Sequence, residues 1–499
     1  MNFSQARVRL VQAGAIFAAA ALFAGCGNNY RPVVTPVNPS GPPSEPASFA
    51  VAVSAPSPTT PGIATIVDYA GDTIMAVAPI GPGPTAFTVD ETGSNGYTIN
   101  SDGTLTNFPV SSTLQAKNVT YTTLPSTAKP LNLFSPSAGL WAADLSGNLA
   151  DVFTGSPQTF LLSIPLAPTP VMVVGPGIRG SRYFAVSQNI ASPTGVECNS
   201  SPTTQPLGEV TGIEVSSYTT DTPRPAGKCP VYAVESPDSA RVFVLNRGSD
   251  TVTVINAQND TLDTCVCPST GCVNQAGQKY FCHPTLPLST TAVTATGITP
   301  PNGITGMTAT AGPVYAEYNA TKNLLIVADY DGNTISVIDV SLDEYGNDSS
   351  TFGTTYTIPV GNNPAAVTVL VDGSRAYTAN QADETVTVVN LSSNLVEKTL
   401  PVIGHPRTVV STQNSVFGKV YVASPDSNYL TIISTGGTDP DIIDTALLLE
   451  GNLVDVRVST QNASSGNNNN ESRIPGFGQP CNLPGTAPTA TLKACQTLP

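Results

Sequence analysis

The feature that most constrains this chain is a short unit that recurs seven times along it. Each unit has a proline-led apolar strand, a turn, and a second strand that begins with a large apolar residue and ends in a small polar one. The second strands are Tyr97–Asn100, Trp141–Asp144, Phe184–Ser187, Phe243–Asn246, Ile326–Asp329, Tyr377–Asn380 and Tyr421–Ser424. Their first residues lie 43 to 83 positions apart. Such a repeat predicts stacked similar units, because one unit alone cannot bury both of its faces.

Each second strand leads through a turn into a third strand in which polar and apolar residues alternate. The clearest are Asp250–Asn256, Asn333–Asp339 and Glu384–Asn390. Alternation at period two predicts that one face of the strand is buried. A fourth strand often follows, as at 356–360. Four short antiparallel strands in about 40–50 residues are typical of a propeller blade, so the predicted fold class is an all-β propeller of four-stranded blades.

The number of blades is seven or eight, and the strand count favours eight. Three more strands are expected before the first repeat, at Phe49–Ser54, Ile63–Asp68 and Thr73–Ala78. A lone strand, Leu453–Thr460, follows the last repeat. Together they would form an eighth blade closed by strands from both ends of the chain. Such closure removes a free sheet edge that would otherwise invite aggregation.

The repeats resemble the YVTN family of β-propeller repeats. The second strands stand where that family has Tyr-Val-Thr-Asn, and the third strands are similar to its Thr-Val-Ser-Val-Ile-Asp stretch. Segments 236–243 and 371–377 are similar to its turn into the second strand. The resemblance is strong from 230 to 435 and weaker from 84 to 215. It implies a propeller, usually of seven blades, and it specifies fold far better than function.

The N-terminus resembles a bacterial lipoprotein signal. Arg7 and Arg9 are followed by an apolar run from Ala13 to Ala24, which is too short to span a bilayer and predicts an export signal over residues 1–25. Cys26 follows small residues as in the lipobox, where the thiol receives diacylglycerol, although Phe23 stands where leucine is usual. An ordinary cleaved signal with an accidental cysteine is the alternative.

The predicted domain boundaries follow from composition. Residues 26–47 are a proline-rich tether, 48–460 the propeller, and 461–499 an asparagine-rich linker with a cysteine-containing tail. A cysteine-rich insertion at about 262–300 interrupts the propeller. In enteric bacteria an aspartate after the lipidated cysteine favours the inner membrane, and here the residue is Gly27. We therefore expect a lipid-anchored protein of the cell envelope, at the outer membrane or cell surface.

Eight further cysteines are an even number in an exported chain, which predicts disulfides. They are Cys198, Cys229, Cys265, Cys267, Cys272, Cys282, Cys481 and Cys495. Proximity in the sequence suggests the pairs Cys198–Cys229 and Cys481–Cys495. The other four cysteines would pair among themselves. The alternative for the middle four is a zinc site with His283, although zinc sites usually contain a C-x2-C pair, which is missing here.

Two other motifs have a structural and a functional interpretation. His405 opens the last repeat and is expected to cap a turn, with a catalytic or metal-binding role as the alternative. The segment Asp329–Asn333 begins like a calcium loop, but Thr334 and Val340 occupy positions where such loops need glycine and glutamate. We expect a turn, with Asp329, Asn246 and Asn380 bonded to the turn backbone.

The formal net charge of −15 argues against nucleic acid as a partner. There is no G-x-S-x-G, H-E-x-x-H or P-loop motif, and the single tryptophan, Trp141, excludes a cofactor made from two tryptophans. We expect no cofactor and a binding or scaffold module for an envelope protein or a small ligand. The alternatives are a lactonase-like hydrolase acting at the central channel, as in some related propellers, and an electron-transfer propeller.

Overall fold

We describe the protein from a computed structural model of the 499-residue chain. The described residues are 48–459, without 69, 137–138, 176–180, 191–205, 266–271, 275, 289–310 and 413, together with strands β37 (Cys481–Asn482) and β38 (Lys493–Ala494), which pair in parallel. The predicted signal peptide, the tether and most of the tail lie outside them.

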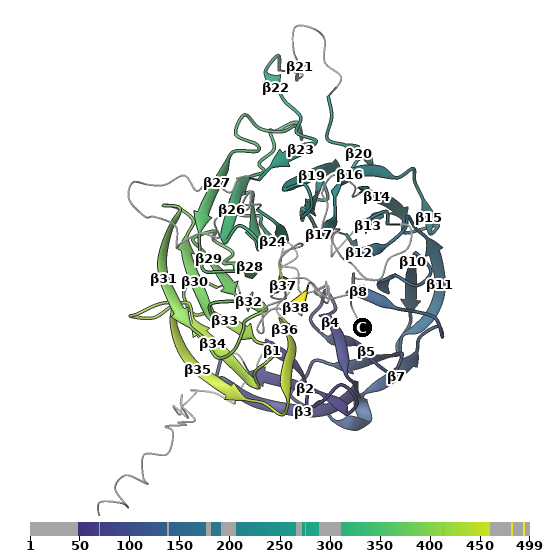
Figure 1. The fold of residues 1–499 in the computed structure, drawn as a ribbon, viewed down its shortest axis with the longest axis vertical. Coiled ribbons are helices and arrows are strands. Elements are labelled where there is room, and N and C mark those ends of the chain that lie inside the picture. Colours follow the sequence, from purple (N-terminus) through teal and green to yellow (C-terminus); the bar gives the residue numbers. More distant parts are fainter. Residues whose placement is uncertain are drawn as a thin grey trace, which may run out of the picture. The chain divides into compact units, whose positions relative to one another are not determined.

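The chain forms eight antiparallel sheets arranged as the blades of a propeller (Figure 1). We number the blades from the N-terminal end and give the strands of each from the inner to the outer edge, with short strands that share the outer position in chain order. Blade 1 contains β36 (Asn452–Val458), β1 (Phe49–Ala55), β2 (Pro61–Asp68) and β3 (Thr73–Pro82); blade 2 contains β4 (Pro84–Val89), β5 (Asn95–Asn100), β6 (Thr104–Pro109) and β7 (Thr120–Thr123), with the 3-10 helix η1 (Ala116–Asn118) before β7; blade 3 contains β8 (Pro130–Phe134), β9 (Leu140–Asp144), β10 (Leu149–Thr154) and β11 (Thr159–Pro165); blade 4 contains β12 (Pro170–Val174), β13 (Arg182–Ser187), β14 (Leu207–Glu214), β15 (Thr219–Thr220) and β16 (Arg224–Lys228).

The second half of the ring follows the same order. Blade 5 contains β17 (Pro230–Glu235), β18 (Arg241–Asn246), β19 (Thr251–Asn256), β20 (Thr261–Leu262) and β23 (Thr285–Pro287), with β21 (Cys272–Val273) and β22 (Lys279–Tyr280) inserted; blade 6 contains β24 (Pro313–Asn319), β25 (Leu324–Asp329), β26 (Thr334–Asp339) and β27 (Thr355–Pro359); blade 7 contains β28 (Pro364–Val369), β29 (Arg375–Asn380), β30 (Thr385–Asn390) and β31 (Leu395–Pro401); blade 8 contains β32 (Thr408–Ser411), β33 (Lys419–Ala423), β34 (Tyr429–Ser434) and β35 (Ile442–Leu448).

The ring closes through a strand from each end of the propeller, as the sequence predicts. β36 pairs antiparallel with β1, with Val456 opposite Ala52 and Val458 opposite Ala50. The inner strands of successive blades contact each other around the whole circle, from β36 to β4 and from β32 back to β36. The prediction of eight blades is therefore confirmed. Closure pairs the inner edge of β1, which would otherwise be free.

The alternating third strands bury their apolar face, as predicted, and their polar face as well. All four central residues of β19 and of β30 are buried. Neighbouring blades cover both faces, so the alternate Thr and Ser side chains point into an interblade layer rather than into solvent. A polar residue at the end of the second strand satisfies these hydroxyls: the Asn246 side-chain nitrogen lies 2.9 Å from the hydroxyl oxygen of Thr253.

The same pairing recurs in blades 2, 6 and 7, where the polar residue that ends the second strand bonds to a hydroxyl of the third strand. The Asn380 amide donates to the hydroxyls of Thr385 and Thr387, at 3.0 and 2.8 Å. In blade 6 the carboxyl of Asp329 accepts from Ser336 at 2.7 Å. The expectation that these side chains bind the turn backbone is thus corrected: they bind the next strand. The buried hydroxyls would otherwise lack partners.

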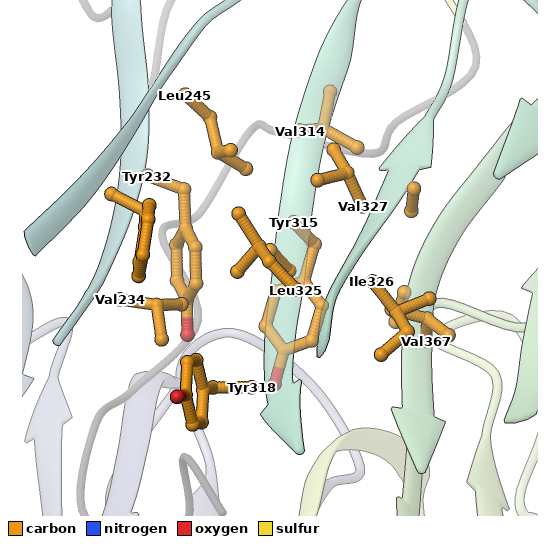
Figure 2. Close-up of a cluster of buried hydrophobic side chains, with 14 of the residues drawn as sticks. Tyr232, Val234, Leu245, Val314, Tyr315, Tyr318, Leu325, Ile326, Val327 and Val367 are labelled. Atoms are coloured by element: carbon orange, nitrogen blue, oxygen red, sulfur yellow. The ribbon is translucent and has the colours of Figure 1, made fainter. Parts of the chain in front are cut away.

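Apolar side chains fill the space between the blades. Figure 2 shows this layer where blades 5, 6 and 7 meet, with Tyr232 and Val234 of β17 facing Tyr315 and Leu325 of blade 6. The rings of Tyr232 and Tyr315 lie 4.7 Å apart between centroids. Each blade therefore depends on its neighbours for burial, which is the reason the repeat has to close into a ring.

Ion pairs also join consecutive blades at one end of the sheets. In these pairs the first residue of a second strand is an arginine or a lysine. It forms an ion pair with an aspartate between the third and fourth strands of the next blade. The pairs are Arg241–Asp348, Arg375–Asp441 and Lys419–Asp72. Blade 6 has Leu324 at the position of the cation, and its neighbour, blade 7, has the uncharged Asn394 in the corresponding turn.

Candidate functional site

The largest described departure from the regular blade is an insertion in the outer strand of blade 5. β20 and β23 both pair with β19, and together they form a fourth strand split by residues 263–284. We call residues 263–284 the arm. Within the arm, Cys272 pairs with Tyr280 in the β21–β22 hairpin. Figure 1 shows β21 and β22 outside the circle of blades. The sequence predicts this insertion at about 262–300.

A disulfide and a charged cluster hold the base of the arm. Cys265 is bonded to Cys282, with their Cα atoms 5.6 Å apart, so the two ends of the arm are joined. Beside the disulfide, the backbone N–H of His283 donates to a carboxyl oxygen of Asp263 at 3.0 Å. The sequence separation of 17 between the two cysteines means that the bond restrains a short segment.

Four charged or titratable side chains meet at this base. A guanidinium nitrogen of Arg241 lies 3.2 Å from both Asp263 and Asp348. The Nδ1 atom of His283 lies 2.7 Å from the other carboxyl oxygen of Asp348. Arg241 also donates to the carbonyl of Gly346 at 3.2 Å. Arg241 starts β18, Asp263 and His283 belong to the arm, and Asp348 belongs to the loop before β27, so the cluster joins blade 5, its arm and blade 6.

The two carboxylates of this cluster lie close together in a buried place. Burial and the neighbouring Asp263 together raise the pKa of Asp348 to about 6, against the opposing effects of His283 and Arg241. Because two acids share one arginine, the ionised cluster keeps an excess negative charge unless His283 is protonated. The His283 ring stacks on Phe352, with centroids 5.2 Å apart, and remains partly exposed.

Apolar side chains are exposed next to this fixed base. Val273 and Phe281 on the arm are more than half exposed, and Tyr345 on the adjoining loop of blade 6 is also exposed. The arm lies along that loop, because Phe281 forms a β-bridge with Asp348 and the Asn274 amide reaches Asp343 at 3.5 Å. The arrangement can present apolar and aromatic groups to a partner without ordering a free loop first.

The structure gives partial information on the predicted cysteines. Cys265 and Cys282 are joined, and Cys229 and Cys272 are also disulfide-bonded. Cys229 precedes Pro230 in a left-handed conformation with φ of 50°. Cys26, Cys198, Cys267 and Cys495 lie outside the described residues, and only the backbone of Cys481 is described, in β37. The lipidation of Cys26 and the other pairings stay predictions.

His405 lies at a turn, as expected, but the side chain that caps this turn is that of Asp426. The backbone N–H of His405 donates to Asp426 at 2.8 Å, and its Nδ1 lies 2.5 Å from the other oxygen of that carboxyl. The Nε2 atom is 3.6 Å from Glu384 of blade 7. Blade 7 repeats the arrangement with Asn362, whose backbone N–H donates to Asp383 at 2.6 Å. Because blade 7 has the same arrangement, a structural role for His405 in joining turns is favoured over a catalytic or metal-binding one.

The calcium interpretation of segment 329–333 is not supported, because these residues form the tight turn between β25 and β26. Asp331 is instead paired with Arg247 of blade 5 at 2.8 Å. Within the described part of the chain, no group of three or more His, Cys, Asp or Glu side chains is arranged to hold a metal ion. The same residues contain no helix of the length and hydropathy needed to cross a membrane.

The sequence interpretation missed three members of the cluster, which are Arg241, Asp263 and Asp348. Arg241 and Asp348 are 107 residues apart, and the repeat segment 236–243 that contains Arg241 does not mark it as part of a charged cluster. The only sequence signal was positional: Arg241 and Arg375 occupy equivalent places at the start of a second strand.

Comparisons with known proteins identify the fold. No family model and no curated protein matches the chain, so the resemblance to YVTN repeats stays a prediction. Solved structures are similar to it at low sequence identity. Apo AztD from Citrobacter koseri is 11% identical, with a TM-score of 0.53 over 83% of this chain and 98% of that one. The dihydro-heme d1 dehydrogenase NirN is 12% identical, with a TM-score of 0.51 over 86% of this chain and 78% of that one. At this identity the likeness shows a shared fold, and the chain is an eight-bladed β-propeller.

Proposed function

We propose that this protein is a lipid-anchored binding module of the cell envelope, in which the propeller supports the arm of blade 5 as the surface that contacts a partner protein. The observation that carries the proposal is the exposure of Val273 and Phe281 on an arm whose base is held by the Cys265–Cys282 disulfide and the Arg241 cluster. Aromatic and apolar groups on a preorganised surface are typical of the central part of a protein interface.

The anchor is part of this proposal and rests on the sequence around Cys26. A lipid on Cys26 and the proline-rich tether of residues 26–47 would hold the propeller near a membrane while leaving its arm free. A single acyl group binds a membrane only weakly, whereas several chains on one residue give stable attachment. The lactonase-like alternative has no specific observation in its favour, since the histidines His283 and His405 are each held by an aspartate at a structural junction.

The experiment is site-specific photo-cross-linking in intact cells, with a photoreactive amino acid in place of Phe281. We expect a discrete adduct, identified by mass spectrometry, that disappears when Val273→Ser is added. The matched control carries the same photoreactive group in place of Tyr121, which is similarly exposed on β7 of blade 2. If both positions give the same adducts, or if position 281 gives none, the arm is not a binding surface.

A further inference from the structure

A second exposed apolar surface lies at the edge of blade 8. The loop between β32 and β33 presents Val416 and Phe417, and Phe417 is 80% exposed, the highest value among the large apolar side chains of the described residues. The corresponding turns of blades 5, 6 and 7, at 236–240, 320–323 and 371–374, contain no exposed large apolar side chain. Among blades 5 to 8, the exposed apolar pair therefore occurs in blade 8 alone and does not follow from the repeat.

Hydrogen bonds fix the loop in the form that exposes Phe417. The side-chain oxygen of Asn414 accepts from the backbone N–H groups of Val416 and Phe417, at 2.8 and 3.0 Å. The carbonyl of Asn414 accepts from the Thr435 hydroxyl at 2.6 Å. The loop is thereby held at both its tip and its base, and Phe417 is presented rather than free to fold back.

Four further exposed apolar residues lie on outer strands at the same junction of blades 8 and 1. Ile442 and Ile443 begin β35 of blade 8, and Ile74 and Met75 lie at the start of β3 of blade 1, all of them exposed. Figure 1 shows β35 and β3 next to each other at the rim of the ring. We call these four residues with Val416 and Phe417 the apolar patch.

An ion pair fixes the two halves of the apolar patch relative to each other. The Lys419 ammonium, two residues after Phe417, lies 2.7 Å from Asp72 in the turn that leads to Ile74. Lys419 also pairs with Asp444, which directly follows the two isoleucines of β35. The cation closest to the patch in sequence is therefore paired with two acids, and the three side chains together carry one excess negative charge.

The propeller begins at this same end of blade 1. Phe49, in the first strand of the described chain, pairs with Asp68, and Val67 next to Asp68 pairs with Ile74. The segment that precedes Ser48 therefore joins the propeller close to the apolar patch. It runs back to Cys26 through the proline-rich residues 27–47, so the proposed anchor would be attached at this end of the propeller.

We propose that the apolar patch rests on the lipid bilayer, with Phe417 inserted among the headgroups and acyl chains. This inference rests on the lipid anchor of the proposed function. Aromatic and aliphatic side chains at an interface bind through burial of apolar surface. The formal net charge of −15 and the excess negative charge around Lys419 favour apolar burial over attraction to anionic lipid, so binding should be insensitive to salt. A protein partner at the same surface is the competing outcome.

The test uses the full lipidated protein in phosphatidylcholine vesicles, some of which carry brominated acyl chains that quench tryptophan. The native Trp141 is buried and gives a constant background. Phe417→Trp places a reporter in the patch. The matched control is Ile403→Trp, which is also exposed and lies in the loop before β32, at the opposite end of that strand from Phe417. Flotation of each protein with the vesicles measures the anchor independently.

If the inference is correct, both variants float, and brominated lipid removes much of the added emission of Phe417→Trp while leaving that of Ile403→Trp unchanged, at low and at high salt. If both float and the two reporters are quenched equally or not at all, the patch does not rest on the bilayer, whereas the anchor stands. In that case a partner protein is the occupant to test. If neither variant floats, the anchor is wrong, and the inference falls with it.

Discussion

The Nδ1 atom of His283 lies 2.7 Å from a carboxyl oxygen of Asp348, which joins the arm of blade 5 to a loop of blade 6. The other oxygen of Asp348 is held by Arg241 at 3.2 Å. One buried carboxylate therefore fixes both the base of the arm and the junction between two blades. The position of the exposed Phe281 depends on this contact, because Phe281 forms a β-bridge with Asp348.

We expect Asp348→Ala to lower the free energy of unfolding by about 1–3 kcal/mol, because it removes the acceptor that Arg241 and His283 share, while Asp263 still pairs with Arg241. Thermal unfolding followed by circular dichroism measures the loss. Glu344→Ala is the matched control, since Glu344 is exposed in the same loop and should change stability by no more than about 0.5 kcal/mol. Equal effects of the two substitutions would show that the cluster does not hold the junction.

The pH dependence of stability tests the interblade polar layer at Asp329. Burial raises the pKa of Asp329 to about 8, so the folded protein keeps this proton at a pH where the unfolded chain has lost it. The contribution of Asp329 to the free energy of unfolding is therefore fully present at low pH, and it is lost as the pH rises from about 4 to about 8. Asn is the residue at the equivalent positions 246 and 380.

Asp329→Asn should therefore gain stability over the wild type as the pH rises through this range, by about 1.4 kcal/mol for each pH unit. The difference should be small near pH 4 and constant above about pH 8. Calorimetric Tm values of both proteins from pH 4 to pH 9 provide the measurement. Parallel profiles for the two proteins would mean that Asp329 titrates normally in the folded state.

Two cations at the junction of blades 7 and 8 should differ in importance. Arg375 is mostly buried and pairs with Asp441, so Arg375→Ala should cost about 3 kcal/mol. Lys398 pairs with Asp439 across the same junction, but both side chains are exposed, and Lys398→Ala should cost about 0–1 kcal/mol. Unfolding in urea compares the two variants, and we expect the lower midpoint for Arg375→Ala. Equal midpoints, or a lower midpoint for Lys398→Ala, would contradict the prediction.

The Cys265–Cys282 disulfide should protect the arm against proteolysis. Lys279 is an exposed trypsin site within the arm, and Lys117 is an exposed site in η1 of blade 2. A bond that closes a loop of this length contributes about 3 kcal/mol to local stability, so the double variant Cys265→Ala, Cys282→Ala should be cut at Lys279 about tenfold faster or more. Cleavage at Lys117 should be unchanged. Mass spectrometry of timed digests measures both sites, and a rise at both would indicate global destabilisation.

Much of the propeller could be predicted from the sequence, because the residues that define one blade lie close together in the chain and recur in the next blade. The tetrapeptides such as Tyr377–Asn380 lie where the second strands are observed, and the strands expected at Phe49–Ser54 and Leu453–Thr460 do pair to close the ring. Strand length, turn residues and a constant order of elements can all be seen in a window of about 50 residues. The alternation of the third strands could not be interpreted locally, because burial of their polar face depends on a neighbouring blade.

The sequence by itself determined the four-stranded blade, the approximate number of blades and the insertion in blade 5. It also led us to expect an anchored, exported chain. Only the tertiary structure decided which residues act together. Arg241, Asp263, His283 and Asp348 meet because two blades and an insertion are brought side by side, and Phe417 lies near the start of the propeller because the ring closes blade 8 onto blade 1. Such contacts depend on the packing of segments far apart in the chain, and no local pattern of residues encodes them.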